Sequence, residues 1–157
     1  MLRTRDPAVA GTFYPADPDS LHEQVTQMLE KAPSREASPK AMIVPHAGYI
    51  YSGDLAAEAY ATLHDLRDQV KTVVLLGPAH RVYFRGIAAP AADEFLTPLG
   101  RIAIDQNAIE SLVEHFPFVE RLPQSHKDEH SLEVQLPFLQ EALNKFRLVP
   151  LVVGDTT

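Results

Sequence analysis

The stretch AMIVPHAGYIYSG, residues 41–53, decides the fold, because an apolar run stops at a proline and is followed by a histidine, two glycines and two tyrosines. A short unbroken apolar run is typical of a strand buried on both faces, as in parallel sheets. Pro45 ends the run because proline has no N–H to donate to a neighbouring strand. The pattern predicts that His46 lies just beyond the C-terminal end of a strand, the edge where open α/β sheets bind ligands.

A second stretch repeats this design. KTVVLLGPAH, residues 71–80, is an apolar run followed by a breaker and His80. A helix with one apolar face, starting near Gly53, is predicted between the two runs. Parallel strands joined through one helix end at the same edge of a sheet, and neighbouring strands lie about 4.8 Å apart. The two imidazoles are therefore expected to reach one ion.

The remaining pattern predicts one α/β domain over residues 1–157, with three layers, α/β/α, and a mainly parallel sheet. Residues 1–18 form an ordered arm over the sheet, and Ser20 opens a helix with a capping box. Further expected elements are a helix at 20–31, short strands at 86–92 and 99–104 joined through 93–98, a helix capped by Asp105, a polar loop at 117–130, a helix at 132–143 kinked or divided at Pro137, and a strand at 147–153.

Composition narrows the function classes. The chain has 157 residues, 45% of them hydrophobic, which suits a single core of ordinary size. No apolar run approaches the roughly 20 residues of a membrane span, and residues 1–7 do not resemble a signal peptide, so a cytoplasmic protein without membrane contact is expected. A net charge of −7 without a basic run argues against nucleic acid as a partner. Because there is no cysteine, any metal site must use His, Asp or Glu.

The chemistry-bearing residues fall in three places: His46, His80 and the triplet 128–130. Two imidazoles and a carboxylate are typical of divalent iron or zinc sites with open positions for water or substrate. Glu129 and His130, just ahead of an apolar helical run, are candidates for the third ligand or for a general acid/base. The alternative for each histidine alone is a hydrogen-bonded structural residue.

The other histidines and the tyrosines divide by position. His22, His64 and His115 fall in or beside helices and are expected to be structural, whereas His126 is open to either interpretation. Packing groups are the commoner role for aromatic residues. Three tyrosines are nevertheless candidate substrate contacts, two of them because they follow His46 directly: Tyr14, Tyr49 and Tyr51.

Five separated blocks resemble the Memo family in order and spacing. They are GTFYP (11–15), PHAGYIYSG (45–53), LGPAH (76–80), DEHSLEVQLPF (128–138) and VPLVVG (149–154). The resemblance implies a fold similar to class III extradiol dioxygenases, which are nonheme iron enzymes, and a metal pocket that includes His46 and His80. The metal would be Fe(II) first, with zinc or copper as alternatives. The implied partners are a radical SAM protein and a third component.

Longer members of that family continue with a further strand and a C-terminal region, so this sequence resembles an N-terminal portion of them. An incomplete sheet would expose an apolar edge and favour a homo-oligomer.

Two hypotheses follow. The first is a Memo-like nonheme metal-binding protein, related to dioxygenases and an oxidoreductase if it is an enzyme, with a pocket at the C-terminal strand edge. In it His46 and His80 are ligands, His130 is a ligand or acid/base, and Glu129 orients an imidazole. The second is a non-catalytic module that uses the same pocket to bind a peptide or another partner. Under either hypothesis, the pocket would bind an unidentified small molecule or peptide.

Overall fold

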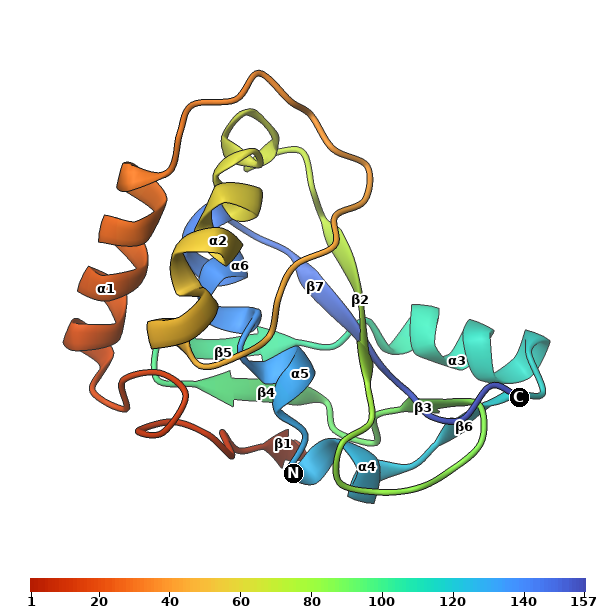
Figure 1. Ribbon diagram of the computed structural model, residues 1–157. Coiled ribbons are helices and arrows are strands. Elements are labelled where there is room, and N and C mark those ends of the chain that lie inside the picture. The colour runs from red at the N-terminus through yellow and green to blue at the C-terminus, as the bar shows by residue number, and fades with distance from the viewer.

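The computed structural model describes residues 1–157, and its strands form two sheets (Figure 1). The four-stranded sheet has the order β2 (Thr72–Pro78), β7 (Arg147–Val153), β3 (Ile87–Ala89), β6 (Val119–Arg121). The three-stranded sheet has the order β1 (Thr4–Arg5), β4 (Glu94–Thr97), β5 (Gly100–Ala103). The helices are α1 (Pro18–Lys31), α2 (Tyr49–Ala61), α3 (Gln106–His115), α4 (Pro123–Lys127), α5 (His130–Glu133) and α6 (Leu136–Ala142), with a 3₁₀ turn at His64–Leu66.

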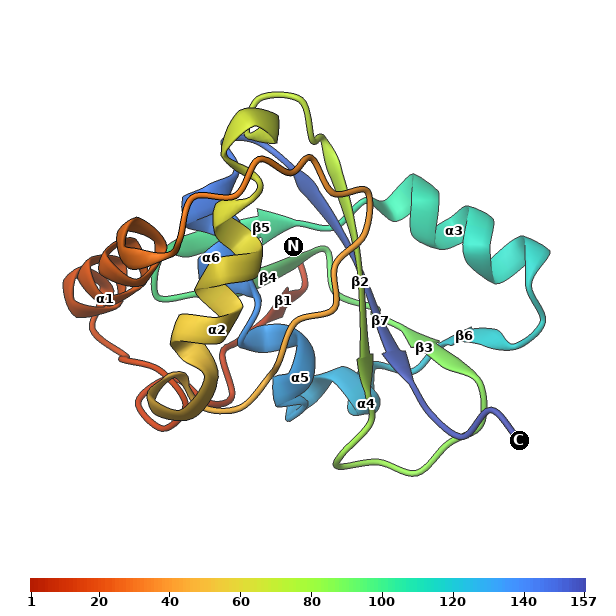
Figure 2. The same ribbon diagram turned by 45° about the horizontal axis from the view of Figure 1, so that its top comes forward.

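The predicted α/β class is confirmed, with a sheet that is mixed rather than purely parallel. β2 pairs with β7, and β3 with β6, in parallel, whereas β3 and β7 are antiparallel. Helices α1, α2 and α6 lie together on one side of β2 and β7, and α3 lies on the other (Figures 1 and 2). This arrangement brings the C-terminal ends of β2 and β7 to the same edge of the sheet.

The core lies between β7 and the helices α1, α2 and α6. β7 is the expected strand at 147–153, and its residues 148–152 are buried because it has neighbours on both sides. The rings of Tyr60 on α2 and Phe138 on α6 stack with their centroids 5.2 Å apart. Such stacked aromatic pairs add to the burial of apolar surface that stabilises the core.

The strand expected at residues 41–45 does not form. Residues 40–47 are irregular and make no backbone–backbone hydrogen bonds, so the predicted βαβ unit is wrong and β7 is the parallel partner of β2. A strand exists only where a second edge lies within hydrogen-bonding reach. Here a hollow of about 690 Å³ separates this segment from β2.

The starts of two helices differ from expectation, and one predicted division of a helix is confirmed. α1 begins at Pro18 because the carboxylate of Asp17 caps it, accepting from Ser20 N at 2.9 Å, so the capping box expected at Ser20 is wrong. α2 begins at Tyr49, four residues before Gly53. The predicted division near Pro137 is confirmed, since α5 ends at Glu133 and α6 begins at Leu136.

No helix is both long enough and apolar enough to cross a membrane.

Two predicted connections contain regular structure. The link expected at 93–98 holds β4, which forms a hairpin with β5, and the expected loop at 117–130 holds β6 and α4. Both strands are short and gain their stability from neighbours distant in sequence, since β1 pairs with β4 and β3 with β6. The cap predicted at Asp105 is confirmed, because its carboxylate accepts from Ala108 N at 3.1 Å.

Candidate metal centre

Three histidines from separate parts of the chain meet at the C-terminal end of β2. His46 precedes α2, His80 follows β2, and His130 is the first residue of α5. One ring nitrogen from each lies within 4.8 Å of the others. The ring centroids are 5.2 Å apart for His46 and His80, and 4.4 Å for His80 and His130. The shared site predicted for His46 and His80 therefore survives although His46 does not follow a strand.

Contacts from α5 and from the residues after it hold the three histidines together. Ser131 Oγ donates to the carbonyl of Pro78 at 3.1 Å, and Gln135 Nε2 donates to the carbonyl of Pro45 at 3.0 Å. Gly77 permits this approach, because a Cβ there would lie 2.7 Å from Ser131 Oγ. The ring of Phe13 packs on His130 with centroids 4.8 Å apart.

Glu129 lies behind His80 and orients it. The buried carboxylate accepts from His80 N at 2.6 Å, from His80 Nδ1 at 2.8 Å and from Ser131 N at 3.0 Å. Because Nδ1 of His80 carries the proton that it donates, Nε2 is left as the free acceptor. This geometry is that of a carboxylate orienting an imidazole, one of the roles that the sequence suggested for Glu129.

The electrostatics favour neutral rings at His46 and His130 beside an ionised Glu129. Burial, and then the neighbouring His80, hold the pKa of both His46 and His130 below the ordinary histidine value. Burial acts to raise the pKa of Glu129, but hydrogen bonds from Ser131 and His80 outweigh it and lower the pKa. Neutral imidazoles are the form that binds metal ions.

The donor set fits a transition metal ion. The buried Nδ1 of His130 has no hydrogen-bond partner, and a cation shared with two neighbouring imidazoles would account for that. Nitrogen ligands at 2.0–2.1 Å from a tetrahedral ion are about 3.4 Å apart, so ring nitrogens that lie within 4.8 Å of one another need to approach by at most about 1.4 Å. The nearest carboxylate, that of Glu129, is occupied by His80. The chain therefore offers three nitrogen donors, and of the two candidates that the sequence left open for the third ligand, Glu129 and His130, it is His130 that joins the cluster.

The tyrosines predicted as substrate contacts lie in different surroundings. The hydroxyl of Tyr14 donates to Glu133 at 2.6 Å, and that of Tyr49 donates to the carbonyl of Val134 at 2.6 Å; both residues are buried. This geometry favours packing over substrate binding for these two. Tyr51 is 83% exposed on α2, and its role as a substrate contact stays a prediction.

The remaining histidines lie outside the cluster. His22 forms a surface pair with Glu141, His115 donates to the carbonyl of Ser111, and His64 is exposed. His126, which the sequence left open, is buried and its Nε2 donates to the carbonyl of Ala88 at 2.8 Å. Burial lowers the pKa of His126 to about 4. A structural role is therefore favoured for all four.

His126 should make folding stability depend on pH. In the unfolded chain it protonates near pH 6.5, but in the folded protein only near pH 4, so the unfolded state binds the extra proton between these values. The free energy of unfolding is expected to fall by up to about 3 kcal/mol as pH drops through this window. Urea unfolding at pH 7 and pH 4.5 measures this.

The matched control is an exposed histidine. His126→Gln should flatten the pH dependence, whereas His115→Gln should leave it as in the parent. Equal pH slopes for the parent and His126→Gln would contradict the assignment.

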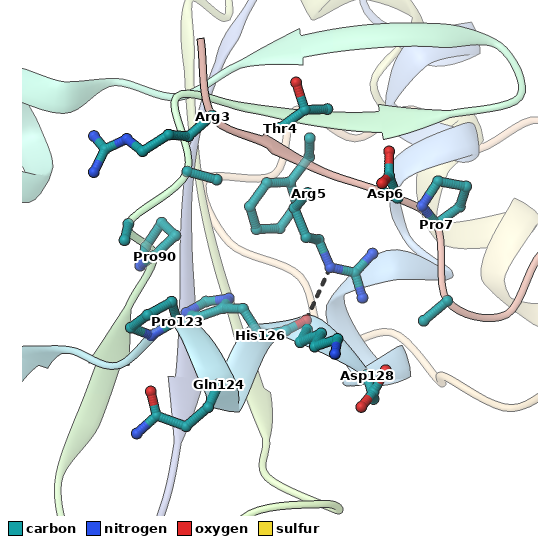
Figure 3. Close-up of a pocket in the computed structure, with 15 residues that line it drawn as sticks. Arg3, Thr4, Arg5, Asp6, Pro7, Pro90, Pro123, Gln124, His126 and Asp128 are labelled. Carbon is teal, nitrogen blue, oxygen red and sulfur yellow. Dashed lines mark hydrogen bonds between the residues drawn. The ribbon is translucent and has the colours of Figure 1, made fainter. Parts of the chain in front are cut away.

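Sequence reasoning missed a buried ion pair that supports the site. Arg5 Nη1 donates to Glu133 at 2.6 Å, and both side chains are buried. Arg5 also donates to the carbonyls of His126 and Glu129, the first of which is drawn in Figure 3. Arg5 thereby ties the N-terminal arm to the turn between α4 and α5. The only signal in the sequence was one charged residue in each of two distant segments. Such a signal is too weak to predict that positions 128 residues apart form a pair.

Figure 3 also shows a second hollow, of about 530 Å³, between the N-terminal arm and α4. None of the three clustered histidines lines it. Two of its charged groups are already paired, since Arg5 binds Glu133 and Arg3 binds Asp93. This hollow therefore lies outside the candidate metal centre.

The fold and the site together define an α/β protein with three histidines clustered at the C-terminal end of the edge strand β2. The family model described as Memo-like protein matches residues 5–157. The chain belongs to the Memo-like family, as its five sequence blocks indicated.

Individual relatives agree with this assignment. A MEMO1 family protein of Aquifex aeolicus is 42% identical over 153 residues, covering 97% of this chain and 55% of the relative. One from Methanosarcina barkeri is 41% identical, covering 96% and 54%, and the memo-1 homolog of Caenorhabditis elegans is 36% identical, covering 97% and 43%. The chain thus spans about half the length of the curated relatives it matches.

Proposed function

We propose that this chain binds one divalent transition metal ion through His46, His80 and His130. The observation that carries the proposal is the convergence of three imidazole nitrogens within 4.8 Å at the C-terminal end of β2. An exposed cluster of acidic groups is a common surface feature, but three partly buried imidazoles repel one another when protonated and gain from a shared cation. The buried Nδ1 of His130, which makes no hydrogen bond and whose contact with Glu129 Oε1 is 3.7 Å long, supports the same conclusion.

The donor set bears on which ion is bound. Fe(II) is the ion that the family resemblance implies first, and nonheme iron sites commonly combine two histidines with a carboxylate. In this chain the third donor is an imidazole, because Glu129 is engaged by His80. Three imidazoles with an open position form a ligand set used by catalytic zinc, and imidazole also suits copper and iron. We therefore propose Zn(II) or Fe(II), with copper as the third choice.

The site is open enough for a small molecule to reach it. The side chain of His80 is 36% exposed, so a ligand can approach from solvent. When bound, the ion would supply a Lewis acid or, as iron or copper, a redox centre. Glu129 holds the proton at Nδ1 of His80 and so directs the other ring nitrogen toward the site, while the lowered pKa values of His46 and His130 keep their rings neutral.

The finer proposal is an oxidoreductase activity related to that of dioxygenases. It concerns the whole protein at the length of the relatives, and this chain spans about half of that length. Its support is the family membership together with a solvent-accessible cluster of neutral imidazoles. The alternative is a recognition module that binds a peptide or partner in the same pocket. A stoichiometric metal ion discriminates between them, because recognition by itself needs none.

The test is a metal titration of the protein purified without a histidine tag. Calorimetry with Zn(II), and with Fe(II) under anaerobic conditions, should give one ion per chain near neutral pH. Affinity should decrease on acidification, because protonated imidazoles cannot bind. The pKa values of His46 and His130 lie below the ordinary 6.5, so most of the loss should occur below that pH. Absence of stoichiometric binding at pH 7 for every ion would favour the recognition module.

A further inference from the structure

The hollow beside β2 lies where a further strand of the sheet would fit. It measures about 690 Å³ and lies between the irregular residues 39–44 and β2, with Tyr60 and Leu139 among the residues that line it. Tyr60 belongs to α2 and Leu139 to α6, so the hollow reaches the helical layer that forms the core. One end lies at His46 and Pro78, next to the metal centre. It is therefore a gap inside the sheet layer rather than a shallow surface groove.

Both walls present unpaired backbone. Residues 40–47 make no backbone–backbone hydrogen bonds, and β2 is an edge strand whose only neighbour is β7. Residues 40–47 and the outer side of β2 have no backbone partner there, although side chains reach the carbonyls of Pro45 and Pro78, and unpaired strand edges favour addition of a strand. A strand lies about 4.8 Å from each neighbour, so a strand inserted in the gap could pair with β2 on one side and with residues 40–45 on the other.

The side chains around the gap are apolar and uncovered. Val74 and Leu76 on β2 are each 57% exposed, and Ile43 is fully exposed. Strands of parallel sheets are normally buried on both faces. Large apolar side chains left in water at adjacent positions mark a surface that other polypeptide covers.

The length of the relatives indicates which polypeptide covers this apolar surface. This chain matches 55% of the Aquifex aeolicus protein and 54% of the Methanosarcina barkeri protein, so each has substantial polypeptide outside the matched region. We propose that the gap is the seat of one apolar β-strand from that additional polypeptide, paired on one side with β2 and on the other with residues 40–45. This inference is independent of the metal proposal and is tested without metal.

The test uses the full chain and short peptides, which need not fold alone. Overlapping peptides of about 15 residues, about twice the length of a typical strand, would cover the unmatched part of the Aquifex aeolicus protein. Each carries a fluorophore and is titrated with the chain in EDTA, with anisotropy as the readout. Only peptides that share one apolar stretch should bind, more tightly than their scrambled versions. Hydrogen exchange should then show protection of residues 40–45 and 72–78.

Proline substitutions supply a matched pair of variants. Successive amides of a strand point to opposite sides, so either Ile43 or Val44 donates into the gap, and neither amide is bonded in the free chain. Of Ile43→Pro and Val44→Pro, one should weaken peptide binding by about tenfold or more and the other far less. Circular dichroism verifies that both variants remain folded.

Three outcomes would overturn the proposal. The first is that no peptide binds better than its scrambled version. The second is that both proline variants bind as the parent does. The third is self-association of the chain with protection of residues 40–45, which would make a second copy the occupant.

Discussion

Replacing His46, His80 or His130 with alanine is expected to abolish stoichiometric metal binding while leaving the fold intact. The three ring nitrogens converge within 4.8 Å, so each variant leaves only two donors. Loss of a group that merely supports a ligand typically costs about 10- to 100-fold in affinity, and loss of a ligand should exceed that. Calorimetric titration of each variant with Zn(II) and Fe(II) measures the effect.

A graded series separates ligands from their support. Glu129→Gln keeps the shape but weakens the acceptor for His80 Nδ1, so it should reduce affinity by about 10- to 100-fold without abolishing binding. His64→Ala is the matched control, because His64 is exposed in the 3₁₀ turn and outside the cluster. If an alanine variant at any of the three clustered positions bound metal as the parent does, that residue would not be a ligand.

Replacing Glu133 with alanine is expected to destabilise the fold by about 3–5 kcal/mol, the usual cost of breaking a buried ion pair. Its carboxylate accepts from Arg5 Nη1 and Tyr14 Oη at 2.6 Å, from Ala8 N at 2.9 Å and from Val9 N at 3.0 Å. The variant leaves the Arg5 cation and three neutral donors without this partner. Native domains are stable by only about 5–15 kcal/mol, so the variant should approach unfolding. Urea unfolding followed by circular dichroism measures the change.

Two further variants test whether the destabilisation by Glu133→Ala comes from loss of the buried ion pair. Glu133→Gln retains the size and one acceptor oxygen, so its loss should be smaller than that of the alanine variant. Glu141→Ala removes a glutamate from a surface pair with His22 and should cost no more than about 1 kcal/mol. A decrease below about 1 kcal/mol for Glu133→Ala would show that the buried pair does not stabilise the arm.

The sequence predicted correctly those helix ends and strands that are set by residues within the same segment. Pro137 divides the helical run at 132–143 because proline cannot donate within a helix, and Asp105 caps α3 through its own carboxylate. The apolar run at 147–153 is a strand, since its residues fit a position covered on both faces. The five blocks identified the family because they carry order and spacing together, which no single motif does.

The sequence by itself determined the α/β class, the family and the histidines worth examining. Only the tertiary structure decided that residues 41–45 are not a strand, that His130 brings a third ring nitrogen beside His46 and His80, and that the Glu129 carboxylate bonds to His80. An apolar run has the same composition whether or not a second edge lies beside it, and hydrogen bonds to that edge are what make a strand. A carboxylate likewise binds the donor that folding brings nearest, and His80 is 49 residues away from Glu129 along the chain.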